Sequence, residues 1–118
     1  MTAPALAAWL TERFDADFAA ELLAEFRAAG RVRVLEARCA ATRGDAVTVE
    51  RAAHTLGSMA LTVGFEELGS LCRTMEARIR VWGLAAVELP PLEEAFAHAE
   101  DEAVGLVRSG LLSAPAGH

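Results

Sequence analysis

The chain has 118 residues, a formal net charge of -6 at pH 7, 53% hydrophobic residues and 24% charged residues. This length and apolar content suit one soluble domain with a hydrophobic core and leave no room for a second. The acidic balance argues against nucleic acid as a partner, because binding to a phosphate backbone normally requires a basic face.

The N-terminal segment carries an apolar run of only about ten residues, too short to span a membrane, and lacks the positive charges of a secretory signal. We therefore expect a cytoplasmic protein with no membrane partner. The two cysteines, Cys39 and Cys72, lie among apolar neighbours and not in a Cys/His cluster. This setting favours buried free thiols in a reducing compartment.

Helical periodicity covers nearly the whole chain, and no segment alternates strictly enough to predict a strand. The pattern predicts an all-α fold with helices at about residues 2–14, 15–42, 45–62, 66–82 and 90–109. Candidate N-caps precede the first three helices, namely Thr2, Asp15 or Asp17, and Asp45. Gly44 and Gly64 are the expected C-terminal stops of the second and third helices. Gly30 falls inside the second helix, where a glycine costs about 1 kcal/mol relative to alanine and allows a kink or break.

The third predicted helix has a core-facing stripe and a histidine away from it. The stripe follows the i, i+3, i+4, i+7 rule and consists of Val49, Ala52, Ala53, Leu56, Ala60 and Val63. His54 lies roughly 150° from the centre of this stripe, so it should face solvent. The ordinary interpretation is an isolated surface histidine.

The face around His54 is poor in charge for a solvated surface. Small residues beside the ring would let another protein approach a nucleophile closely, and exposed aliphatic side chains would give it a docking contact. The candidate docking residues on this face are Val47, Glu50, Arg51, Gly57, Ser58 and Leu61.

The fourth predicted helix carries a possible partner for this histidine. Its core stripe consists of Leu68, Leu71, Cys72, Met75, Ile79 and Trp82. Glu76 lies at the edge of the stripe, and an antiparallel hairpin turning at residues 63–65 would place it opposite His54. A carboxylate that accepts from one ring nitrogen would leave the other free and nucleophilic. Arg73 and Arg80 could neutralise a phosphoryl group, or could belong to an ordinary solvated face.

A metal site is not expected. His98 and His118 have no ligand spacing to His54. His98 lies at the edge of the apolar stripe of the last helix, which indicates a structural role.

The spacing of these residues resembles the histidine-containing phosphotransfer (HPt) domain of bacterial two-component phosphorelays. Family members carry a motif A-H-x-L-K-G-(S/A)-(S/A)-x-x-(L/V/F)-G, then a leucine four residues on and L-C-x-x-L-E. The corresponding residues here are Ala53, His54, Leu56, Ala60, Val63, Gly64, Leu68, Leu71, Cys72, Met75 and Glu76. The resemblance implies an antiparallel four-helix bundle with a short additional N-terminal helix, formed by residues 1–112, with 113–118 as a disordered tail.

The resemblance also implies roles for the site residues. The Nε2 atom of His54 would accept a phosphoryl group, while Glu76 would bind Nδ1 and orient the imidazole. Two of the departures from the family pattern concern the site, because Gly57 replaces a lysine that helps hold the phosphoryl oxygens and Ser58 replaces a glycine. Either Arg73 or Arg80 takes over that role, or the partner supplies the charge. The TVGF run also resembles the N-terminal phosphotransfer domain of chemotaxis-type histidine kinases.

The expected function is therefore a phosphoryl carrier that exchanges its group with the aspartate of a response-regulator receiver domain. A histidine kinase catalytic domain is the other expected partner, because the chain has no Walker-type phosphate loop and should not use ATP alone. We expect no cofactor on this chain, and Mg²⁺ in the partner receiver domain. The alternative is a non-catalytic helical adaptor that docks receivers or kinases without carrying phosphate.

Overall fold

The computed structural model describes residues 2–112. The described chain consists of five α-helices and one short 3-10 helix: α1 (Ala3–Arg13), α2 (Ala16–Thr42), α3 (Ala46–Thr62), α4 (Glu66–Trp82), η1 (Leu84–Ala86) and α5 (Pro90–Arg108). The all-α prediction is confirmed. The predicted tail, residues 113–118, lies outside the described residues.

The helices begin where the sequence places capping side chains. Thr2, Asp15 and Asp45 each accept a hydrogen bond from a backbone N–H in the first turn of α1, α2 and α3. The connections after α2 and α3 need a left-handed backbone, which Gly44 supplies at φ +70° and Gly64 at φ +87°. These short connections make α2, α3 and α4 successive antiparallel neighbours.

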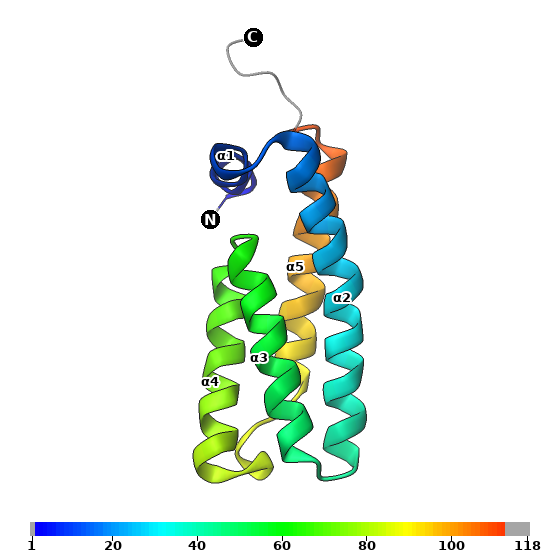
Figure 1. The fold of residues 1–118 in the computed structure, drawn as a ribbon, viewed down its shortest axis with the longest axis vertical. Helices are drawn as coiled ribbons and strands as arrows, with labels where there is room; N and C mark the ends of the chain where they lie inside the picture. Colours follow the sequence, from blue (N-terminus) through cyan, green and yellow to red (C-terminus); the bar gives the residue numbers. More distant parts are fainter. Residues whose placement is uncertain (1, 113–118) are drawn as a thin grey trace.

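The four longer helices, α2 to α5, contact one another in a closed ring, and α1 covers one end of it (Figure 1). In the ring, α3 packs between α2 and α4, while α5 contacts the same two helices from the other side. Each helix of the ring runs antiparallel to the next (Figure 1). The first helix, α1, crosses the end of the bundle near the α3–α4 turn. The prediction of a four-helix bundle with an additional N-terminal helix is confirmed.

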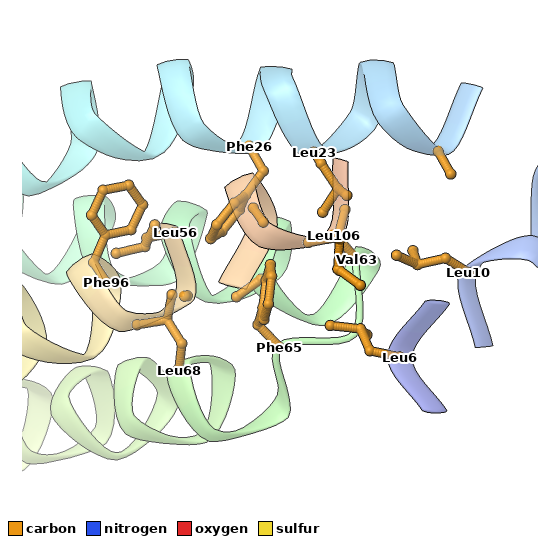
Figure 2. Packing of buried hydrophobic residues seen from close by; sticks show 14 of the residues in the cluster. Leu6, Leu10, Leu23, Phe26, Leu56, Val63, Phe65, Leu68, Phe96 and Leu106 are labelled. Atoms are coloured by element: carbon orange, nitrogen blue, oxygen red, sulfur yellow. The ribbon is translucent and has the colours of Figure 1, made fainter. Parts of the chain in front are cut away.

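Aromatic and leucine side chains from every α-helix fill the core (Figure 2). Phe26 of α2 is central, with its ring centroid 5.0 Å from that of Phe65 and 5.6 Å from that of Phe96. Leu6 and Leu10 of α1 close the end of this core (Figure 2). Burial of such side chains stabilises a fold by about 1.5–3 kcal/mol each, so the core holds the α3–α4 pair in place.

The second helix runs unbroken through Gly30, in agreement with the predicted range of residues 15–42, and a Cβ atom at this position would overlap the ring of Phe96. Two features differ from the sequence prediction. Cys39 is exposed on α2, whereas Cys72 is buried as predicted. Trp82 is 75% exposed, because it stands at the last turn of α4.

His98 also departs from its predicted structural role, since its side chain is exposed and pairs with Glu102 at 2.8 Å. Within residues 2–112, no helix has the length and apolar character needed to cross a membrane.

Candidate functional site

His54 lies in the middle of α3 with its side chain turned to solvent. The side chain is 63% exposed. Its neighbours in the sequence on the other side of the helix, Ala52, Ala53 and Leu56, are buried in the core. The predicted outward orientation of His54 is therefore observed. The core-facing stripe fixes the rotation of α3, and this rotation presents the ring beside α4.

Glu76 of α4 meets the imidazole from the neighbouring helix. The Nδ1 atom of His54 lies 3.0 Å from Oε1 of Glu76, which is hydrogen-bond distance. The Glu76 side chain is only 16% exposed, so the contact is shielded from water on one side. Because an ionised carboxylate can only accept, the proton of this bond belongs to Nδ1. The lone pair of a neutral ring is then on Nε2, the nitrogen that Glu76 does not bind.

A second ion pair joins the same two helices one turn away. The Nε atom of Arg80 donates to Oε1 of Glu50 at 2.9 Å, and Nη2 lies 2.7 Å from the same oxygen. Nη2 also donates to Oε1 of Glu76 at 3.2 Å. The pKa of Arg80 is raised above its usual value, chiefly by the hydrogen bond to Glu50 and then by the charge of that carboxylate. Arg80 is therefore bound by two carboxylates.

Arg73 stands on the other side of the ring and is differently placed. It lines a shallow hollow beside the imidazole together with His54, Ser58, Glu76, Ala77 and Arg80. Arg73 is exposed and forms no hydrogen bond or ion pair with any part of residues 2–112. Of the two predicted arginines, Arg73 alone has a guanidinium that is not already paired.

The buried thiol next to the site is not a nucleophile. Cys72 lies one turn before Glu76 and is fully buried. Burial, and secondarily the negative charge of Glu76, raise the pKa of the Cys72 thiol to about 12. Because the thiolate is the reactive form, this cysteine is inert at neutral pH. Within residues 2–112, no three His, Cys, Asp or Glu side chains are grouped so that they could hold a metal ion.

In a comparison with known families, the model of the Hpt domain matches residues 21–112. The chain belongs to the Hpt domain family. Neither a curated protein nor a solved structure matches the chain. Membership of the Hpt family implies phosphotransfer in phosphorelays, and Hpt domains generally interact with response regulators and kinases. The matched region contains α3, α4 and the whole His54–Glu76 site, while α1 lies before it.

Gly57 of this Hpt domain has a different role from the one that the helix wheel predicted. The prediction that it lies on the exposed docking face is wrong, since Gly57 is buried where α3 crosses α4. A Cβ atom at this position would be 2.9 Å from Cβ of Cys72 and 3.6 Å from the carbonyl oxygen of Gly69. Gly69 faces the same crossing, where a Cβ would lie 2.6 Å from Cγ of Leu61. The two glycines allow the helices to approach closely.

The other predicted docking residues surround the ring at different depths. Val47, Arg51 and Ser58 are exposed, with 63% of Val47 open to solvent. Leu61 is half-buried because it covers Gly69. Glu50 is half-buried and held by Arg80, a pairing that the sequence analysis missed. The register of the α3–α4 hairpin could have predicted this pairing, since Glu50 is four residues before His54 and Arg80 is four residues after Glu76.

Proposed function

We propose that this Hpt domain is a phosphoryl carrier that accepts its group on Nε2 of His54 and exchanges it with the aspartate of a receiver domain. One observation carries the proposal. Nδ1 of an exposed imidazole lies 3.0 Å from a mostly buried carboxylate, while Nε2 is left for chemistry. A surface histidine with no function would not need an interhelical partner that fixes its tautomer.

The transfer balances with the groups present. The Nε2 lone pair attacks the phosphorus of an aspartyl phosphate in line with the departing oxygen. An N–P bond forms, the P–O bond breaks, and the electrons of that bond leave with the aspartate carboxylate of the partner. The ring keeps its Nδ1 proton and gains positive charge, which the carboxylate of Glu76 stabilises through the same hydrogen bond. The reverse sequence returns the phosphoryl group to an aspartate.

The negative charge of the incoming phosphoryl group is neutralised by an arginine of α4 and by groups of the partner. Arg73 lines the hollow beside the ring and is unpaired within residues 2–112, so its guanidinium is available to the phosphoryl oxygens. This chain is proposed to hold no cofactor of its own, with Mg²⁺ bound in the receiver. The alternative phosphoryl donor to His54 is ATP held by a separate histidine kinase catalytic domain.

The partner docks on the α3 surface around the ring. Val47 and Leu61 lie on α3 on either side of His54 along the helix, and they offer apolar contacts to an approaching receiver. Ser58 and Arg51 complete the exposed surface next to the ring. The small side chain of Ser58 leaves room for an aspartyl phosphate to reach Nε2 in line.

Incubation with a radiolabelled phospho-receiver or with a cognate kinase and ATP tests the proposal. We expect acid-labile, alkali-stable label on the wild type and none on His54→Gln, which keeps the size of the side chain but has no imidazole. Equal labelling of His54→Gln and wild type would refute the assignment. Circular dichroism of both proteins controls for folding.

A non-catalytic adaptor is the second candidate, and the absence of the family lysine at Gly57 favours it. In that case the surface around Val47 and Leu61 binds receivers without transfer. Binding would survive His54→Ala, and no phosphate would appear on the wild type at any time. Isothermal titration calorimetry with an unphosphorylated receiver, combined with the labelling experiment, distinguishes the two functions.

A further inference from the structure

The Glu50–Arg80 pair lies in register with the His54–Glu76 pair. Glu50 precedes His54 by four residues on α3, and Arg80 follows Glu76 by four residues on α4. Because residues four apart share a helix face and the two helices are antiparallel, both pairs face the same side of the hairpin. The Glu50–Arg80 pair therefore forms one layer of side chains between α3 and α4, directly next to the catalytic layer formed by His54 and Glu76.

One guanidinium connects the two layers. Arg80 binds Glu50 through Nε and Nη2, and Nη2 reaches Oε1 of Glu76, the same oxygen that His54 approaches. A glutamate held by a single hydrogen bond from a ring N–H can still rotate about its terminal torsion. A second donor from a fixed direction removes this freedom. Glu50 supplies the fixed direction, because it anchors the guanidinium to α3.

We propose that Arg80, anchored by Glu50, is a positioning residue that holds Glu76 on Nδ1 of His54 and keeps Nε2 unprotonated, whereas Arg73 is the arginine available to the phosphoryl group. The proposal rests on the proposed phosphoryl-carrier function. It assigns different tasks to two arginines that the sequence alone could not distinguish. It also gives Glu50 a role inside the site in addition to its place on the docking face.

The first test needs no phosphoryl chemistry. Long-range ¹H–¹⁵N NMR spectra report which ring nitrogen carries the proton, with the His54 signals assigned by their loss in His54→Gln. We expect wild type to hold the proton mainly on Nδ1 at pH 8. Arg80→Met should shift the population toward the Nε2–H tautomer, and Glu50→Gln should shift it part of the way. Arg78→Met is the matched control, because Arg78 is exposed on the same helix and has no ion pair within residues 2–112.

The second test is the rate of phosphoryl acceptance from a phospho-receiver. Arg80→Met should lose rate several-fold, together with its loss of the Nδ1–H tautomer. Arg80→Lys should restore part of the rate and part of the Nδ1–H population, because it restores the charge but an ammonium lacks the guanidinium fork. Glu50→Gln should add no further change in the Arg80→Met background, since the pair acts as a unit.

The outcomes separate this proposal from the function on which it rests. Tautomer populations in Arg80→Met that match those of Arg78→Met would overturn the positioning role, whatever the rates are. If wild type accepts no phosphoryl group but Arg80→Met still changes the tautomer, the carrier function fails while the positioning of the ring stands. If Arg80→Met loses helical signal in circular dichroism, Arg80→Lys takes its place in the test. A tautomer population in Arg80→Lys equal to that of wild type would then refute the positioning role.

Discussion

Replacement of Gly57 by alanine is expected to destabilise the protein, although it removes a glycine from a helix. The new Cβ would lie 2.9 Å from Cβ of Cys72, a distance that real Cβ atoms do not tolerate. The opposing atom is fixed to the backbone of α4, so a rotamer change cannot relieve the overlap and the helices must separate. Overpacking of this kind costs about 1–3 kcal/mol. The higher helix propensity of alanine returns about 1 kcal/mol.

The net expectation is a loss of about 0–2 kcal/mol in the free energy of unfolding, from these two opposing effects. Gly105→Ala is the matched control, because Gly105 lies inside α5 and a Cβ added there would have nothing within 4 Å. That variant should gain up to about 1 kcal/mol. Urea unfolding followed by circular dichroism gives both values. The reasoning is refuted if Gly57→Ala is stabilised as much as Gly105→Ala.

Three further predictions concern other residues. A thiol reagent should modify Cys39 in the native state at pH 8 but reach Cys72 only after unfolding. Because the folded-state pKa of Cys72 is raised from 9.0 to about 12, the contribution of this thiol to the free energy of unfolding should decline as pH rises from about 9 to 12. A Cys72→Ala variant should lose this part of the alkaline decline in stability. Asp45→Ala should lower the thermal midpoint at neutral pH, and since hydrogen bonds lower the pKa of Asp45, the difference from wild type should vanish as acid protonates this carboxylate. Arg73→Met should slow phosphoryl transfer to His54 and weaken its salt dependence without changing the His tautomer, whereas Arg78→Met should do neither.

The sequence was sufficient to predict the helices and the outward position of the histidine, because both depend on local patterns. Capping side chains such as Asp15 and Asp45 mark helix starts, and the core stripe of α3 fixes the direction of His54. The contact with Glu76 could also be predicted, since an antiparallel hairpin with a short turn leaves little freedom in register.

Other features depend on the neighbours of each helix, which a single-helix wheel does not contain. Gly57 lies roughly 90° from the centre of the α3 stripe and would be a flank position on a helix with one neighbour. Because α3 packs against both α2 and α4, its buried arc is wider and includes this glycine. The prediction for Trp82 is wrong in the opposite sense. Its position on the helix wheel faces the core, but its side chain is exposed because it stands at the end of α4. The bridge from Arg80 to two glutamates required side-chain coordinates.

The chemical identity of the phosphorylated atom decides whether His54 carries the phosphoryl group on Nε2. We suggest ³¹P NMR with ¹⁵N-histidine labelling of the wild-type protein after transfer from a phospho-receiver. We expect one N–P signal, coupled to Nε2 of His54 and absent in His54→Gln. A phosphoryl group on Nδ1 of His54 would contradict the role of Glu76, and one on any other residue would contradict the assignment of the site.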